Sequence, residues 1–211
     1  MKNSCKILFL LVAILSLNVC FAQTVLSEKE QRVFTEKVQE TARKTATISS
    51  DFKQLKYLEM LSEPIVSEGK LVFKAPDKIL WQYHTPKAYK VIFKEDVLLV
   101  DNDGTKDEIK LSSNKLFRSF NTLMVNSIQG YMFDEMEFKI SYFKTNEGYL
   151  VTFEPRDKRM KRFATAFELS FTQNTGEVTQ IKLIEPNKDY TLITFSNRKT
   201  NSKVLDTTFK L

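Results

Sequence analysis

A chain of 211 residues, 42% hydrophobic and 27% charged, is long enough for one domain with a sizeable core. Its formal charge of +6 is dispersed and lacks the basic stripe with interleaved aromatic residues that nucleic-acid binding requires, so we expect no nucleic-acid partner. Both cysteines, Cys5 and Cys20, lie near the N-terminus. The remainder of the chain therefore has no disulfide and no cysteine metal site.

Residues 1–22 have the pattern of a cleaved secretory signal. Lys2 and Lys6 form the charged part, residues 7–17 form the apolar part, and Ala22 ends a small-x-small cleavage site. Cleavage after Ala22 leaves residues 23–211 as a single domain of 189 residues and lowers the formal charge to +4, since two lysines leave. Two alternatives stay open. One is an uncleaved anchor, although spanning a bilayer takes roughly 20 apolar residues; the other is lipoprotein processing at Cys20.

The mature chain is predicted to begin with a helix. Ser27 and Glu30 have the spacing of a capping box, in which each side chain binds a free backbone amide of the first turn. A helix to about Thr45 would carry one weakly apolar stripe, which includes Phe34 and Val38. A helix with such a stripe must lie against another element.

Three strand-like runs follow, the first beginning at Phe52 and the others covering residues 69–74 and 78–83. Residues 75–77 contain Pro76, which favours a tight connection between the last two runs. Side chains alternate across a strand, so each run presents one apolar face. We expect a hairpin with an apolar wall, formed by Leu71 and Phe73 on one strand and by Ile79, Trp81 and Tyr83 on the other.

The rest of the chain is typical of an antiparallel sheet with one further helix. Residues 101–104 favour a hairpin turn over a calcium loop, because Gly104 is misplaced for the latter. Residues 114–130 have helical spacing, with apolar side chains that include Leu123, Met124 and Ile128. The other expected strands cover residues 89–93, 97–100, 138–142, 149–153, 167–171, 178–184 and 190–195.

About ten strands with helices in only two places predict a mainly β fold with helices (α+β). Because no β-α-β alternation is present, a parallel sheet is not expected. We predict a curved antiparallel sheet that forms a half-open, incompletely closed barrel covered by a helical lid.

Catalytic motifs are missing from the mature sequence. His84 is its only histidine, and without cysteine or a second histidine the usual triads and zinc sites are excluded. Carboxylate pairs such as Asp107 with Glu108 resemble solvated loop charges more than a glycosidase pair. We expect no enzyme activity, no metal and no cofactor. One basic run between strands either contacts anionic headgroups or an acidic partner, or is a hydrated loop; it contains Arg156, Lys158, Arg159, Lys161 and Arg162.

The ordered set of these features resembles the LolA-type periplasmic carriers of outer-membrane lipoproteins. The family pattern is F-x-Q, then a glycine strand of G-x-L/F type, then a proline hairpin that leads to tryptophan. Here these are Phe52 with Gln54, Gly69 with Leu71, and Pro76 followed by Trp81. The resemblance extends through the C-terminal strands to an expected final strand near Phe209.

The resemblance implies a periplasmic, monomeric carrier whose apolar cavity shields the acyl chains of a lipoprotein or another lipid. Its partners would be an inner-membrane lipoprotein-release transporter and an outer-membrane acceptor. The implied cavity wall comprises Phe52, Leu71, Phe73, Ile79, Trp81 and Tyr83, and the implied lid Leu123, Met124 and Ile128. Well-studied members of the family hold the lid closed with an arginine immediately before the hairpin proline, whereas this chain has Ala75 there. Two alternatives remain: a LolA-like carrier of another hydrophobic product, and an envelope interaction module whose aromatic residues form a dry core.

Overall fold

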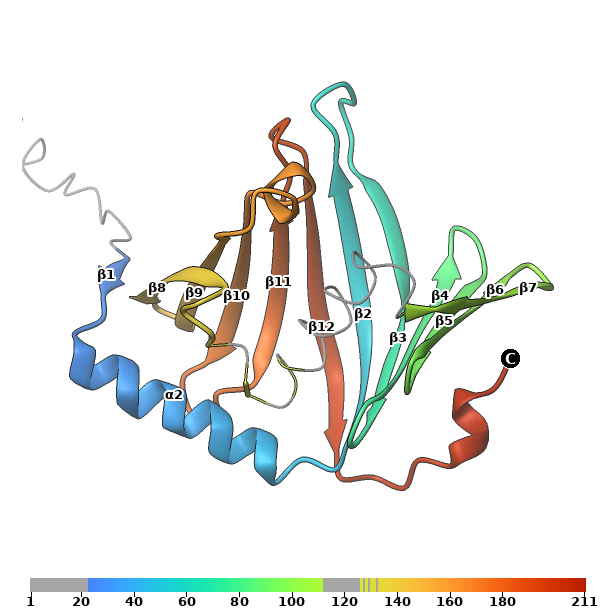
Figure 1. Cartoon of the computed structure of the whole chain (residues 1–211), viewed down its shortest axis with the longest axis horizontal. Helices are drawn as coiled ribbons and strands as arrows, with labels where there is room; N and C mark the ends of the chain where they lie inside the picture. The colour runs from blue at the N-terminus through green and yellow to red at the C-terminus, as the bar shows by residue number, and fades with distance from the viewer. Residues whose placement is uncertain (1–22, 112–125, 127, 129, 132) are drawn as a thin grey trace, which may run out of the picture.

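The fold is a single twelve-stranded antiparallel sheet that curves without closing (Figure 1). A computed structural model describes residues 23–111, 126, 128, 130, 131 and 133–211. The strand order is β1-β8-β9-β10-β11-β12-β2-β3-β4-β5-β6-β7, and the two outermost strands do not pair with each other. The predicted incompletely closed barrel is confirmed. Its strands are β1 (Thr24–Val25), β2 (Thr47–Tyr57), β3 (Ile65–Lys74), β4 (Lys78–Thr85), β5 (Tyr89–Lys94), β6 (Val97–Asn102), β7 (Thr105–Lys110), β8 (Phe138–Lys144), β9 (Gly148–Pro155), β10 (Ala166–Thr172), β11 (Val178–Ile184) and β12 (Tyr190–Thr200).

Helix α2 (Glu28–Arg43) confirms the predicted N-terminal helix. The Ser27 backbone amide donates to Glu30 Oε2 over 2.9 Å, and the Glu30 amide donates to Ser27 Oγ, which completes the capping box. Phe34 and Val38 are the buried residues of the helix. The Phe34 ring meets Tyr149 at 4.6 Å and Phe171 at 5.1 Å between ring centroids, so α2 covers the sheet around β9 and β10.

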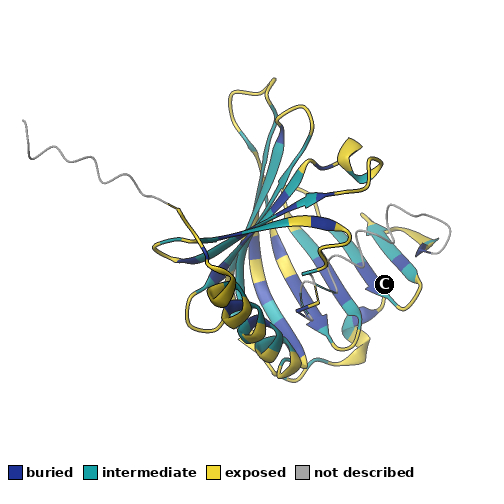
Figure 2. Cartoon of the chain, turned by 60° about the vertical axis from the view of Figure 1, so that its left-hand side comes forward, coloured by how far each residue is buried: buried dark blue, intermediate teal, exposed yellow. Residues whose placement is uncertain are grey.

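Alternation along each strand separates two faces of the sheet. In Figure 2 buried positions alternate with more exposed ones along the strands. The face that α2 covers carries two apolar clusters. The first joins Phe34 and Val38 to β8, β9 and β10. The second, called here the β2–β6 cluster, consists of Ile48, Phe52, Leu71, Phe73, Ile79, Trp81, Phe93, Leu98 and Leu111.

The C-terminal segment covers part of the opposite face. Phe209 is 2% exposed and packs with Val72, Leu80 and Ile92, whose side chains alternate with those of the β2–β6 cluster. The segment ends in a 3-10 helix, η3 (Asp206–Phe209), so the strand expected near Phe209 is wrong. Because Phe209 already fills an apolar site on the outer face of the sheet, it needs no strand to be buried.

Two ion pairs fasten this segment. Asp206 Oδ1 lies 2.8 Å from Lys78 Nζ and 3.1 Å from Lys74 Nζ, and Lys74 also donates to the backbone oxygen of Val204. The hydrogen bonds from Lys78 and Lys74 lower the pKa of Asp206 to about 2. Lys74, next to the position where the family has its arginine, is therefore engaged with the C-terminal segment.

The hairpin turn between β6 and β7 is confirmed. Asn102 pairs with Thr105 across the turn, and the two turn residues have φ values of +56° at Asp103 and +86° at Gly104. Positive φ at both positions is the requirement of a type I′ turn. Strand β7 itself was not expected from the sequence, because its charged residues leave only Ile109 as an apolar signal. The helix expected over residues 114–130 lies almost wholly outside the described residues, although Ile128 is described and packs against the β2–β6 cluster.

Gly69 provides a first test of the fold. A Cβ atom there would clash with the carbonyl oxygen of Gln82 and would lie 2.6 Å from Phe52 Cζ. We expect Gly69→Ala to lower the free energy of unfolding by about 1–3 kcal/mol, measured by urea denaturation, because both neighbours are held in place. The matched control Lys70→Ala, on the exposed side of the same strand, should unfold like the parent protein. Equal stability of the two variants would contradict this close packing.

Candidate functional site: an apolar cavity beside Trp81

Three aromatic rings from β2 and β4 form the centre of the site. The Phe52 ring lies 4.8 Å from Trp81 and 5.0 Å from Tyr83 between ring centroids. Register explains the contact, since Phe52 pairs with Gly69 on β3 and Gly69 pairs with Tyr83 on β4. The missing side chain at Gly69 leaves the space that the Phe52 ring occupies. These are the residues of the F-x-Q, glycine and tryptophan pattern, so that pattern describes one physical contact.

Tyr83 and Gln54 bring polar groups to this wall. The Tyr83 hydroxyl donates to Gln54 Oε1 over 2.9 Å. Burial raises the pKa of the Tyr83 hydroxyl, and the neighbouring Trp81 side chain offsets part of that rise. The Trp81 indole N–H does not reach hydrogen-bond geometry with Tyr83 or with any other described residue. The wall is therefore aromatic with few polar groups.

A cavity of about 430 Å³ lies against this wall, and it is called here the larger cavity because it exceeds a second cavity under α2. The volume is within the range of about 300–1,000 Å³ that is usual for ligand sites. Trp81 and Tyr83 line one side, and Leu183 and Ile193 belong to the strands opposite. The full lining is Gln54, Lys56, Trp81, Tyr83, Tyr89, Val91, Phe93, Phe167, Leu169, Ile181, Leu183, Thr191 and Ile193.

Two further hollows adjoin the larger cavity. A groove over β5, β6 and β7 shares Tyr89, Val91 and Phe93 with it. A smaller cavity of about 60 Å³ lies between the C-terminal half of α2 and the sheet. Trp81 and Ile181 line both the larger and the smaller cavity. These two side chains therefore stand between them.

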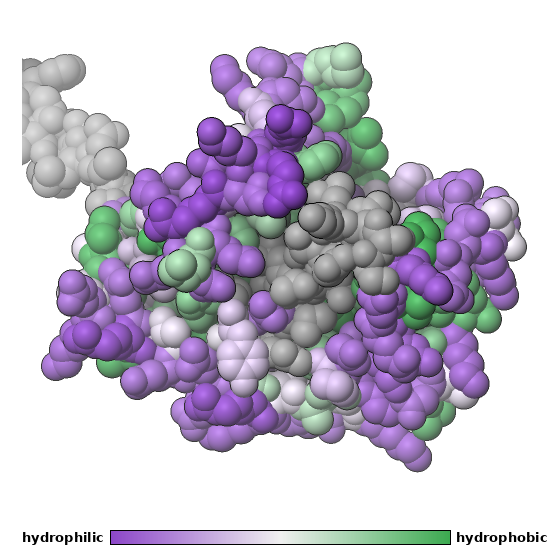
Figure 3. Space-filling model, in the orientation of Figure 1, coloured by the Kyte–Doolittle hydropathy of each residue, from purple (hydrophilic) through white to green (hydrophobic). Residues whose placement is uncertain are grey.

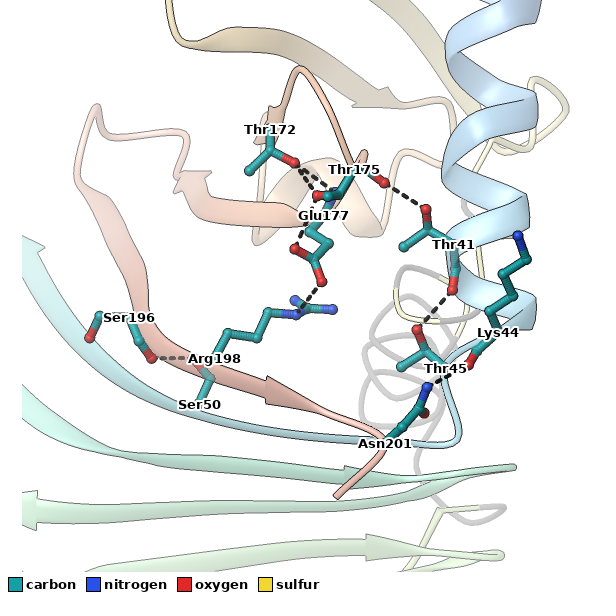
Figure 4. Close-up of polar contacts among 10 residues, drawn as sticks. All are labelled: Thr41, Lys44, Thr45, Ser50, Thr172, Thr175, Glu177, Ser196, Arg198 and Asn201. Carbon is teal, nitrogen blue, oxygen red and sulfur yellow. Dashed lines mark hydrogen bonds and ion pairs between the residues drawn. The ribbon is translucent and has the colours of Figure 1, made fainter. Parts of the chain in front are cut away.

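The smaller cavity has a polar side, drawn in Figure 4. Arg198 on β12 and Glu177 beside β11 form an ion pair, with 3.2 Å between Nε and Oε1 but without the angle of a hydrogen bond. Their side chains are 24% and 25% exposed. Burial lowers the pKa of Arg198, and the negative charge of Glu177 opposes that shift.

Nearby contacts hold α2 against the sheet (Figure 4). Thr41 Oγ1 donates to the backbone oxygen of Thr175 over 2.6 Å, and Asn201 Nδ2 donates to the backbone oxygen of Lys44 over 2.9 Å. Gly176, with φ at +67°, lies directly under the helix, since a Cβ there would be 3.2 Å from Val38 Cγ2. The C-terminal end of α2 is thus held to the residue after β12 and to the turn before β11.

The structure brings together most of the expected cavity residues without giving them equal roles. Phe52, Leu71, Phe73, Ile79 and Trp81 are buried in one cluster, with Tyr83 and Ile128 packed against it. Trp81 and Tyr83 line the larger cavity, and Leu71, Trp81 and Ile128 line the smaller one. Phe52, Phe73 and Ile79 lie behind this lining. Leu123 and Met124 lie outside the residues that the structure describes.

Sequence reasoning missed most of the larger cavity, since only Trp81 and Tyr83 of its lining were expected there. The β5 residues Val91 and Phe93, and the residues Leu169, Ile181, Leu183 and Ile193 from β10, β11 and β12, were recognised only as strand positions. Their alternation identified a buried face. The pairing of β12 with β2, between segments far apart in the chain, decides that this face adjoins Trp81.

The basic run lies in the exposed loop between β9 and β10. Arg156, Lys158, Arg159, Lys161 and Arg162 are all exposed. Arg156 Nε donates to the backbone oxygen of Glu135, and Arg159 pairs with Asp157 over 2.7 Å. Hydrogen bonds from Arg159 lower the pKa of Asp157 to about 2.

The described part of the chain contains no group of three histidine, cysteine, aspartate or glutamate side chains placed to hold a metal ion, and His84 is exposed on β4. Within the same part, no helix has the length and apolar character needed to cross a membrane.

An open, strongly curved antiparallel sheet with a helix over an apolar hollow defines the class of the protein as a LolA-like open barrel. The sequence model of the family described as outer membrane lipoprotein carrier protein LolA matches residues 43–211, and the chain belongs to this family. Comparison with curated protein sequences yields no match.

Solved structures align with most of this chain at low sequence identity, and those with a TM-score of at least 0.50 share its fold. An uncharacterized conserved protein from Thermus thermophilus has a TM-score of 0.53 at 6% identity, covering 85% of this chain and 92% of its own. The Pseudomonas aeruginosa MucA/MucB complex has a TM-score of 0.50 at 10% identity, covering 86% of this chain and 61% of the matched one. A LolA superfamily protein from Nitrosomonas europaea has a TM-score of 0.48 at 9% identity, with coverages of 85% and 97%.

The ion pair of the smaller cavity gives a second test. Glu177→Gln would leave the largely buried guanidinium of Arg198 without its counter-charge. We expect this variant to lose about 1–3 kcal/mol of unfolding free energy in urea denaturation. Adding Arg198→Met should restore most of the loss, because the double variant leaves no unpaired charge.

An exposed ion pair on α2 provides the control. Glu40 and Lys44 are 59% and 73% exposed, so Glu40→Gln should leave the unfolding curve nearly unchanged. If Glu177→Gln lowers the free energy of unfolding no more than Glu40→Gln does, the Arg198 guanidinium does not need the Glu177 carboxylate for stability.

Proposed function

We propose that this protein is a periplasmic carrier that shields the acyl chains of lipoproteins and moves them from the inner to the outer membrane. The observation that carries the proposal is the larger cavity, whose lining is mostly aliphatic and aromatic. Exposing a sixteen-carbon chain to water costs roughly 12 kcal/mol, at about 0.8 kcal/mol for each methylene. A carrier must therefore enclose its cargo, and membership of the lipoprotein-carrier family agrees with that role.

The route to the periplasm follows from the first 22 residues. Their pattern of two lysines, an apolar run and Ala22 supports export and cleavage, with residues 23–211 as the working domain. An inner-membrane release transporter would load the carrier, and an outer-membrane acceptor would unload it. The carrier would act as a monomer, without catalysis, metal or cofactor.

One observation favours a variant of this function. The position of the family arginine is Ala75, and the neighbouring Lys74 binds Asp206 and Val204 at the C-terminal segment. A lid held in another way suits a LolA-like carrier whose cargo is a different lipid or hydrophobic product. The alternative of an envelope interaction module with a dry aromatic core draws on the tight burial of Phe52, Phe73 and Ile79, at most 3% exposed.

Filling the cavity separates the carrier from the dry module. Ile193 lines the larger cavity, whereas its neighbour Leu192 lies on the opposite face of β12. We expect Ile193→Trp to weaken binding of a dansyl-labelled fatty acid or a triacylated lipopeptide by about tenfold or more, because the larger ring occupies the space of the chain. Binding is measured from the fluorescence of the directly excited dansyl group, and competition is measured from the loss of that fluorescence when the lipopeptide displaces the probe.

Leu192→Trp is the matched control and should bind the probe like the parent protein. Both variants must unfold in urea near the parent midpoint. Equal affinities of the two variants, or no affinity for the probe in the parent protein, would contradict the cavity as the binding site.

A further inference from the structure

Three loops meet at one end of the sheet. The β2–β3 loop touches the β11–β12 turn, where the Glu59 amide donates to Asp189 Oδ1 over 2.7 Å. The loop before β10 touches the end of β11, where the Thr165 amide donates to the oxygen of Ile184 over 2.8 Å. Figure 1 shows these loops together at the upper end of the strands, whereas α2 crosses the lower end. They form one continuous rim.

The β2–β3 hairpin carries an exposed apolar tip on this rim. Met60 is 86% exposed, Leu61 and Ile65 are each 46% exposed, and Val66 is 39% exposed. Figure 3 shows the hydrophobic patch over this projecting hairpin. Exposed apolar side chains that cluster in this way mark an interaction surface more often than scattered ones do.

The loop before β10 adds positive charge and one more apolar side chain. This loop has five exposed basic residues and one acidic residue, Asp157. Phe163 follows them and is 54% exposed. The hairpin tip carries the opposing charges Glu59 and Glu63, both exposed. Exposed carboxylates also lie beside the loop, because Arg156 donates to the backbone oxygens of Glu135 and Glu137 in the segment before β8. The surplus of cations therefore belongs to the basic loop itself and not to the whole rim.

The larger cavity extends to the same end of the sheet. Of its lining residues, Lys56 is next to the last residue of β2, Leu183 is next to the last residue of β11, and Thr191 follows the first residue of β12. These are the strand ends that the rim loops connect. Whatever the rim binds is therefore brought close to the cavity.

We propose that this rim docks on an anionic lipid surface, with the hairpin tip inserted among the headgroups and the basic loop bound to them. Apolar side chains on a projecting tip suit insertion into the boundary between headgroups and acyl chains, whereas a protein groove would need a broader apolar face. Each cation near an anionic bilayer strengthens binding by about fivefold. The inference rests on the proposed function for its purpose, since docking would present the cavity to acyl chains at the membrane.

Co-sedimentation with vesicles tests docking without any cargo. We expect the mature protein to bind vesicles of phosphatidylethanolamine and phosphatidylglycerol, and to bind phosphatidylcholine vesicles far more weakly. The double variant Met60→Ser with Leu61→Ser should bind about tenfold more weakly. The triple variant Lys158→Glu, Lys161→Glu and Arg162→Glu should lose about a hundredfold at low salt and lose the salt dependence.

Matched controls lie on α2, across the other end of the strands. Val33→Ser removes a side chain that is 60% exposed, and Lys29→Glu with Arg32→Glu and Arg43→Glu reverses three cations on the helix. If these controls weaken binding as much as the rim variants, the effect is one of general charge and hydrophobicity, and the proposal is wrong. The proposal is also wrong if the parent protein does not bind anionic vesicles.

The dansyl-probe assay keeps this inference distinct from the proposed function. The rim variants should still bind the fatty acid like the parent protein, because they leave the cavity lining unchanged. Vesicle binding without fatty-acid binding would support docking and contradict the carrier function. Fatty-acid binding without vesicle binding would support the carrier function and contradict docking.

Discussion

The contact between the Phe52 ring and the bare backbone of Gly69 is the constraint on which this wall of the barrel depends. With no side chain at Gly69, the ring lies over β3 and reaches Trp81 and Tyr83 on the next strand. The three rings fill the space above a glycine that would otherwise be a gap in the sheet. Trp81 is thereby held at the boundary of both cavities, as a stiff wall for the hollow beside it.

In both halves of the sheet, side chains alternate between the two faces along each strand, but the two apolar faces are covered differently. Over β8, β9 and β10, helix α2 inserts Phe34 and Val38, and the result is a packed core. Between β5 and β10, the inward side chains face each other across the larger cavity, and none of the described residues fills it. On the outer face, Phe209 and the pairs of Asp206 with Lys74 and Lys78 close the sheet from behind. The larger cavity thus lies in a sheet that is packed against α2 in one half and against the C-terminal segment on its outer face.

The sequence predicted the parts of this fold that rest on local patterns. The capping box at Ser27, the hairpin around Pro76 and the turn at Gly104 follow from residues close together in the chain. Strand β7 could not be predicted, because its charged side chains carry little alternation. Phe209 was misassigned because its burial depends on the outer face of β3, β4 and β5, which no local pattern reveals. The wall at Trp81 was predicted through the family pattern, whereas Ile181 and Ile193 needed the pairing of β12 with β2.

Native mass spectrometry of the mature protein, purified from its own cell envelope and followed by lipid extraction, tests the central claim most directly. The account predicts a chain that begins at Gln23, together with a bound acylated molecule that extraction removes and whose mass identifies the cargo. A chain that is free of ligand, and that acquires none when a triacylated lipopeptide is added, would contradict it.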